Sequence, residues 1–171
     1  MFTNIQIDID SLPKVESIDF VSVKRSYFYI LLFNYGISYL TLISVLIITN
    51  FLIEDSGLNF SITLVISLLS FALLIHLGIL KLGFKNRKYA LREKDIVFSK
   101  GYLQVTTTIL PFNRVQHVEI SRSLLERKFN LSTLKIYTAG DSGSDLSIGG
   151  LSQNDAEAIN VYLTTLLNGS V

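Results

Sequence analysis

Side chains able to carry out covalent or acid–base chemistry are few in this chain of 171 residues, and they are scattered. Cysteine is absent, which excludes thiolate nucleophiles, disulfides and thiolate metal sites. His117 has no second histidine or cysteine near it with which to bind a metal. Asp141 and Asp145 lie close together, but the ligand spacing and terminal glutamate of a calcium loop are missing. No phosphate-binding glycine loop or nucleophile elbow is visible, so we expect no enzyme activity, cofactor or metal.

His76 lies well inside the second of two long apolar stretches. Ionisable groups inside a membrane are costly and often functional, so this histidine could sense protons. Alternatively, it stays neutral and hydrogen-bonds within a helical hairpin, near the cytoplasmic end. The sequence leaves both roles open.

Five polar residues form the candidate interaction surface: Arg114, Gln116, Arg122, Arg127 and Lys128. The last three surround a predicted short helix. They could contact lipid phosphates or an acidic partner. The alternative is an ordinary solvated basic surface, which is the more common role of such clusters.

Arg114 and Gln116 also have structural interpretations. Gln116 has the same strand parity as the apolar Val118, so a regular strand would direct its amide into the core, where it would need hydrogen-bond partners. Arg114 could pair with Glu119 or Glu126 rather than with a ligand. Both residues could therefore serve either recognition or folding.

Two apolar stretches, 27–53 and 58–84, dominate the N-terminal half. Each is at least as long as the roughly 20 apolar residues that a membrane-spanning helix requires. The only charged residue in them is Lys81, which lies near the end of the second stretch, where its long side chain can reach the headgroups. Because only residues 54–57 separate the stretches, we predict an antiparallel transmembrane hairpin.

Charge around the two stretches predicts their orientation. Lys24 and Arg25 precede the first stretch, basic residues at 85, 87 and 88 follow the second, and the linker between them is acidic. The positive-inside rule then predicts that both termini are cytoplasmic. The first ten residues contain no basic residue, so we expect an uncleaved anchor rather than a signal peptide.

The chain accordingly divides into a cytoplasmic leader at 1–26, a hairpin at 27–84 and a small domain at 85–171. Within the leader, residues 5–10 alternate between apolar and polar side chains. This pattern is typical of a half-buried strand. Either the segment docks on the sheet of the small domain, or the leader has no fixed structure.

Residues 85–171 contain short β-rich segments separated by turn residues. We predict strands at 87–92, 95–99, 102–110, 114–121, 131–138 and 145–148. Leu103, Val105 and Ile109 share one parity, which indicates one face of a strand. The pair Gly149-Gly150 indicates a turn after the last strand.

Two capping patterns predict helices in this domain. Ser123 and Glu126 form a capping box for a short helix that ends before Asn130, a residue suited to the left-handed conformation. Ser152 and Asp155 begin a C-terminal amphipathic helix in the same way.

Several residues between 100 and 140 follow a known family pattern. They are Lys100-Gly101 through Leu110-Pro111, Arg114-Val115-Gln116, Val118, Leu124, Arg127, Phe129, Leu131, Leu134 and Thr138-Ala139-Gly140. Together with the preceding hairpin, they resemble the bacterial pleckstrin-homology-like (PH-like) domain of YdbS-like membrane proteins. Asn130 stands where that family favours glycine, a change that the left-handed conformation tolerates.

The resemblance implies an N-terminal two-helix transmembrane hairpin followed by a mainly-β PH-like domain. That domain would have about seven antiparallel strands, one short internal helix and a C-terminal capping helix. The family supplies no catalytic reaction to transfer.

We therefore expect a non-enzymatic protein of the bacterial inner membrane that presents its cytoplasmic PH-like domain as a protein-interaction or scaffold module. Besides the bilayer, its expected partner is a membrane protein carrying related domains, or a second copy of itself. The small excess of basic residues does not indicate nucleic acid. The alternatives are anionic-headgroup sensing through Arg122, Arg127 and Lys128, and an accessory role in a membrane transport or envelope-stress complex.

Overall fold

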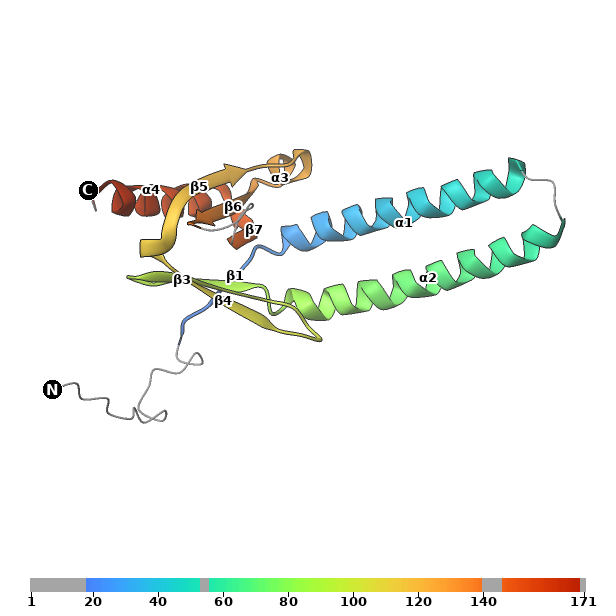
Figure 1. Cartoon of the computed structure of the whole chain (residues 1–171), viewed down its shortest axis with the longest axis horizontal. Helices are drawn as coiled ribbons and strands as arrows, with labels where there is room; N and C mark the ends of the chain where they lie inside the picture. Colours follow the sequence, from blue (N-terminus) through green and yellow to red (C-terminus); the bar gives the residue numbers. More distant parts are fainter. Residues whose placement is uncertain (1–17, 53–55, 140–145, 170–171) are drawn as a thin grey trace, which may run out of the picture.

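The computed structural model describes residues 18–52, 56–139 and 146–169. Helices α1 (Ser26–Leu52) and α2 (Ser56–Phe84) run side by side in opposite directions and extend away from a β domain (Figure 1). The predicted hairpin is therefore confirmed. The strand considered at residues 5–10 lies outside the described residues.

Both long helices expose apolar side chains along most of their length. The most apolar stretch has a mean hydropathy of 2.0 in Ser26–Leu52 and 2.4 in Ile62–Phe84, and both helices are long enough to cross a membrane. Large side chains such as Phe51, Leu68 and Leu74 are exposed rather than packed against protein. The core helix of a soluble protein would bury them, so the hairpin surface is suited to lipid.

Two antiparallel sheets make up the β domain. The first contains, in spatial order, β1 (Val21–Ser22), β2 (Lys88–Leu91), β3 (Asp95–Lys100) and β4 (Thr106–Pro111). The second contains β5 (Val115–Ser121), β6 (Leu131–Thr138) and β7 (Leu146–Ser152). The remaining elements are the 3-10 helix η3 (Phe112–Arg114) between the sheets, α3 (Leu124–Lys128) between β5 and β6, and the final helix α4 (Gln153–Gly169).

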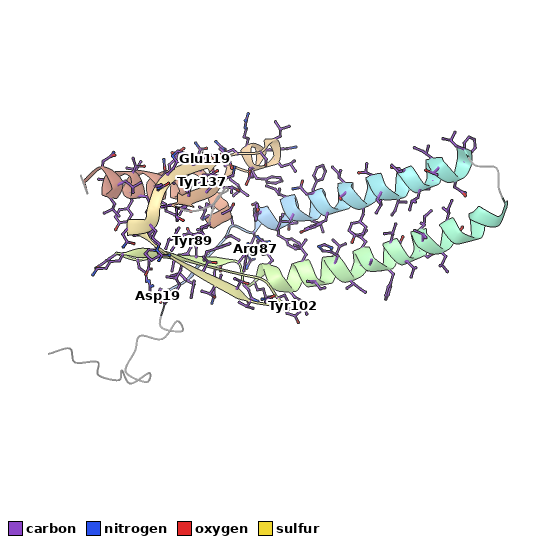
Figure 2. The ribbon with its side chains drawn as sticks, viewed as in Figure 1. Asp19, Arg87, Tyr89, Tyr102, Glu119 and Tyr137 are labelled. Atoms are coloured by element: carbon purple, nitrogen blue, oxygen red, sulfur yellow. The ribbon has the colours of Figure 1, made fainter. Side chains whose placement is uncertain are left out.

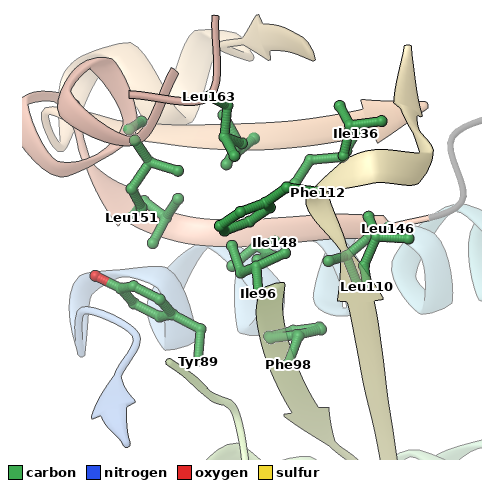
Figure 3. Close-up of a cluster of buried hydrophobic side chains, with 14 of the residues drawn as sticks. Tyr89, Ile96, Phe98, Leu110, Phe112, Ile136, Leu146, Ile148, Leu151 and Leu163 are labelled. Carbon is green, nitrogen blue, oxygen red and sulfur yellow. The ribbon is translucent and has the colours of Figure 1, made fainter. Parts of the chain in front are cut away.

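Apolar side chains from both sheets and α4 meet in one core (Figure 3). The most deeply buried are Ile96, Leu134, Ile136, Ile148, Leu151 and Leu163. Helix α4 begins where the backbone N–H of Asp155 donates to Ser152 Oγ over 3.2 Å, as the sequence predicts. Its buried face, which includes Ala156 and Ile159, then covers the sheets. The mainly-β domain with a C-terminal capping helix is thus confirmed.

The chain just before α1 is part of the β domain. Val21 and Ser22 pair with Tyr89 and Lys88 of β2. Val23 is buried in the core. This stretch falls in the predicted leader, so the leader contributes a strand to the sheet, although at a different position from residues 5–10. Helix α1 consequently leaves directly from the domain.

Gln116 is exposed, contrary to the expectation that a regular strand would bury it. The pairing of β5 with β6 shifts register between Val115 and His117, which is a β-bulge. The bulge keeps Val115 buried and lets both following side chains face outward. The amide therefore needs no partner in the core.

The apolar residues between β3 and β4 face outward as well. Regular pairing in β4 begins only at Thr106, and Gly101 has a φ of 107°, which favours glycine. Leu103 and Val105 are exposed, whereas the buried side chain of β4 is Leu110, of the opposite parity. Residues 101–105 thus form the tip of the β3–β4 hairpin, here called the β3–β4 tip, rather than part of a strand.

Candidate interaction surface

Helix α3 is held by the capping box that the sequence predicts. The backbone N–H of Ser123 donates to Glu126 Oε2 over 2.8 Å, and the backbone N–H of Glu126 donates to Ser123 Oγ over 3.3 Å. Thr133 Oγ1 of β6 also donates to Glu126 Oε1 over 2.6 Å. Asn130 then turns the chain with a φ of 53°. The buried carboxylate of Glu126 is therefore committed to the fold.

The three basic residues around α3 share one end of the domain. Arg122 Nε donates to the carbonyl of Leu131 over 3.1 Å, and Arg127 Nε donates to the carbonyl of Arg122 over 3.4 Å. Lys128 is exposed. Helix α3 contacts α1 and lies on the hairpin side of the domain (Figure 1), so this basic group is close to the membrane-spanning segment.

Arg114 and Gln116 lie at the other end of β5 and are exposed. A seven-residue strand rises about 3.4 Å per residue, or roughly 20 Å in all. The five predicted residues therefore form two separate groups, one near the hairpin and one far from it.

The proposed partners of Arg114 are engaged elsewhere. Glu119 accepts hydrogen bonds from Tyr137 Oη over 2.9 Å and from Lys135 Nζ over 3.2 Å. Glu119 and Tyr137 are labelled in Figure 2. Both bonds lower the pKa of Glu119, and the bond from Tyr137 has the larger effect. The bond between Tyr137 and Glu119 also raises the pKa of Tyr137. Glu126 is bound within the α3 turn. The structure therefore does not contain the expected Arg114 ion pair with either carboxylate.

A glycine pair joins the hairpin to the β domain. Gly149 and Gly150 lie inside β7, where they are buried, and not in the turn that the sequence suggests. The ring of Tyr27, in the first turn of α1, occupies the space next to them. A Cβ added at Gly149 would lie 2.3 Å from Tyr27 Oη, and one at Gly150, whose φ is 83°, would lie 2.6 Å from the ring. Only glycine permits so close an approach.

Further contacts surround this junction. The backbone N–H of Lys24 donates to the carbonyl of Gly150 over 2.9 Å, and the backbone N–H of Val23 donates to the carbonyl of Arg87 over 3.2 Å. The Arg87 guanidinium lies 6.0 Å from the centre of the Tyr27 ring, a cation–π contact. The rings of Phe28 and Phe84 meet edge to face with centres 5.4 Å apart. Both helices are thus tied to the domain at their first or last turn.

His76 packs between the two long helices. Its ring centre lies 4.3 Å from that of Tyr35 and 6.2 Å from that of Tyr39. These three residues line a hollow of about 320 Å³. Among the described residues, no three His, Asp or Glu side chains gather closely enough to hold a metal ion. The hydrogen-bonded and proton-sensing roles of His76 both stay predictions.

A groove of about 650 Å³ lies between η3 and the end of α4, and we call it the distal groove. The C-terminal end of α4 lies at the end of the domain away from α1 and α2 (Figure 1). Its apolar lining is Pro111, Phe112, Val115, Leu163, Leu166 and Leu167, and Glu93 and Lys94 also line it. Phe112 packs edge to face on Tyr162, with ring centres 6.0 Å apart. None of the residues in the predicted interaction surface lines this groove, which forms where η3 meets the end of α4.

Comparison with known proteins agrees with this architecture. The family model described as "Bacterial PH domain" matches residues 28–166. The transmembrane protein YdbS of Bacillus subtilis (strain 168) is 42% identical over 59 residues, which are 34% of this chain and 37% of that protein. The match thus spans little more than a third of the curated relative, and no solved structure matches this chain. Two exposed apolar helices tied to a two-sheet domain identify a transmembrane protein, and the chain belongs to the bacterial PH domain family.

Proposed function

We propose that this protein is a non-enzymatic scaffold that holds its PH-like domain at a membrane surface and presents it to a protein partner. The observation that carries this proposal is the junction in which Tyr27 packs on Gly149 and Gly150. A flexible linker would let the domain turn freely, whereas this junction gives it a defined orientation. A partner in the same membrane would meet the domain at high effective concentration, so a weak contact would suffice.

The distal groove is the surface best suited to that partner. It is apolar, and the exposed Tyr162 and Leu166 of α4 lie in or beside it. A few well-packed anchor residues, tyrosine prominent among them, provide most of the binding energy in protein interfaces. The favoured partner is a membrane protein carrying related domains, or a second copy of this chain.

We further propose that the domain lies on the cytoplasmic side of the bacterial inner membrane, with both termini on that side. Lys24, Arg25, Lys85, Arg87 and Lys88 all lie near the domain end of the hairpin, which agrees with the positive-inside rule. A reporter that is active only outside the cytoplasm, fused after Val171, should be inactive. An active reporter would refute the orientation.

The scaffold role is tested with the full chain purified from its native membrane in mild detergent. Leu166→Glu places a charge in the distal groove, while Thr164→Glu places the same charge on an exposed position of the same helix. We expect self-association, or a co-purifying membrane protein, to be lost with Leu166→Glu and retained with Thr164→Glu. Equal behaviour of both variants, or a monomer without partner in the parent chain, would refute the role.

Anionic-headgroup sensing is a second candidate, because Arg122, Arg127 and Lys128 lie in or just before α3, and α3 contacts α1. A ligand that binds only the folded state raises its thermal stability. Short-chain phosphatidylglycerol should then stabilise the detergent-purified chain more than phosphatidylcholine does. Arg127→Gln combined with Lys128→Gln should abolish the difference, and the control Lys94→Gln, at the distal groove, should preserve it. An unchanged difference in the double variant would refute this role.

A further inference from the structure

The β3–β4 tip exposes three apolar side chains close together in sequence. Tyr102 is 44% exposed, Leu103 is 82% exposed and Val105 is 53% exposed. Tips of hairpins in water are usually built from polar and small residues. A tip of this composition is therefore better suited to an apolar environment than to water.

The tip is fastened to the domain end of α2. Asn86 Nδ2 donates to the carbonyl of Gly101 over 2.8 Å. A Cβ added at Gly83 would lie 3.2 Å from Tyr102 Cβ, so the two backbones are in close contact. Gly83 belongs to the apolar span Ile62–Phe84. The tip thus lies beside the membrane-spanning segment itself (Figures 1 and 2).

The depth of the tip follows from the helix geometry. Tyr102 lines a hollow of about 160 Å³ together with Tyr35, His76 and Gly83. His76 comes eight residues before the end of α2, which is about 12 Å along the axis at roughly 1.5 Å per residue. Tyr102 therefore lies alongside the last turns of the span, where amphipathic aromatic rings are favoured at the membrane interface.

The charges near the tip fit the same location. Residues 101–105 contain no charged side chain, and the exposed Lys100 precedes them. Exposed Lys81 and Lys85 flank the end of α2. Long lysine side chains can place their ammonium groups among headgroups while the neighbouring residues are apolar.

A second apolar protrusion lies on the other side of the hairpin. Leu124 is 82% exposed on α3, beside the start of α1 and next to the basic Arg127 and Lys128. The β3–β4 tip and α3 thus point toward the membrane from the two sheets, with the helical hairpin emerging between them (Figure 1).

We propose that the β3–β4 tip inserts into the interfacial layer of the bilayer, with Leu103 reaching the boundary with the acyl chains and Leu124 making a matching contact on the opposite side. The occupant of these surfaces is lipid, because both are continuous with the lipid-covered surface of the hairpin. The β domain then contacts the membrane at two points, in addition to its covalent connection to the hairpin. This contact is independent of any protein partner.

The chain contains no tryptophan, so Leu103→Trp introduces a single fluorescent probe. Val161→Trp is the matched control, because Val161 is 64% exposed and belongs to α4, which extends away from the hairpin (Figure 1). Both full-length variants are reconstituted into phosphatidylcholine–phosphatidylglycerol vesicles, with and without lipids that carry a nitroxide near the headgroup. Their far-UV circular dichroism is compared with that of the parent chain, and Leu124→Trp repeats the test if Leu103→Trp fails to fold.

We expect the Leu103→Trp emission to shift to shorter wavelength and to lose intensity with the nitroxide lipids, while Val161→Trp shows neither effect. Emission and quenching equal to those of Val161→Trp would overturn the proposal. A blue-shifted emission that the nitroxide lipids do not quench would also overturn it, because that result would place the side chain against protein instead of lipid.

Discussion

The tightest steric constraint between hairpin and domain is the contact of Tyr27 with Gly149, and it gives the sharpest prediction. Gly149→Ala adds one methyl group at a position without positive φ, so the backbone itself should tolerate alanine. The new Cβ would lie 2.3 Å from Tyr27 Oη and 2.7 Å from Cζ. Ordinary van der Waals contact begins near 3.4 Å. The ring must therefore retreat by about 1 Å, a case of overpacking.

The cost can be bounded from the structure. Overpacking of one methyl group costs about 1–3 kcal/mol, and 1 kcal/mol lowers the melting temperature of a domain of this size by about 4–8 °C. Tyr27→Ala should also destabilise, because it removes a half-buried ring. In the Tyr27→Ala background, however, Gly149→Ala should cost almost nothing. The coupling energy in the double-mutant cycle should thus equal the free-energy cost of the clash, about 1–3 kcal/mol.

The assay is thermal unfolding of the full chain in detergent, followed by circular dichroism. Gly36→Ala is the matched control, because an added Cβ there meets nothing within 4 Å. We expect the melting temperature to fall by at least about 4 °C in Gly149→Ala and not to fall in Gly36→Ala. Equal melting temperatures of Gly149→Ala and Gly36→Ala would show that the proposed rigid junction is wrong. Additive effects of Tyr27→Ala and Gly149→Ala on the free energy of unfolding would show the same.

Four further predictions concern the second sheet and the turn around α3. Ser123→Ala removes the N-cap of α3 and should cost about 1 kcal/mol in urea unfolding. Asn130 has a φ of 53°, so Asn130→Ala should cost about 1–2 kcal/mol while Asn130→Gly should cost little; equal losses would refute the left-handed turn. Hydrogen bonds from Tyr137 and Lys135 lower the pKa of Glu119 from 4.5. The ionised carboxylate therefore stabilises the folded chain above pH 4.5, and this stabilisation is lost as the pH falls through the folded-state pKa. Urea titrations should therefore show Glu119→Gln approaching the parent chain in acid, and a constant difference across this pH range would contradict the assignment. The pKa of Tyr137 is raised from 10.0, so the pH dependence has the opposite sign. The parent chain should be more stable to urea than Tyr137→Phe below pH 10, and this difference in stability should decrease above pH 10.

The parts of the fold that depend on local interactions could be predicted from the sequence. Hydropathy alone identified both long helices, because a 20-residue apolar stretch has few alternatives to a membrane span. The capping boxes at Ser123 and Ser152 placed the starts of α3 and α4, since the cap satisfies backbone groups within the same turn. Asn130 was correctly assigned to a left-handed turn for the same local reason.

The features that shape the surface depend on distant residues and could not be predicted so directly. Alternation placed Gln116 inward, but the bulge that exposes it is visible only in the pairing of β5 with β6. The pair Gly149-Gly150 by itself predicts a turn, although glycine inside a strand also indicates that another part of the chain approaches closely. Here that part is Tyr27, more than a hundred residues away in sequence. Similarly, the shared parity of Leu103 and Val105 predicts a strand face, because only the folded chain shows that this segment lies beside the end of α2.

The proposed fixed orientation of the domain would also limit which partners could reach the distal groove. Helix α4 starts near the junction with Tyr27 and runs away from the hairpin, and its 17 residues extend about 25 Å at roughly 1.5 Å per residue (Figure 1). The distal groove lies at its far end. If the proposed partner lies in the same membrane, it must project roughly 20 Å from the bilayer to reach the groove, which takes at least about six residues of fully extended chain. A membrane protein with its own folded domain on that side meets this requirement, whereas one with only tight loops between its helices does not.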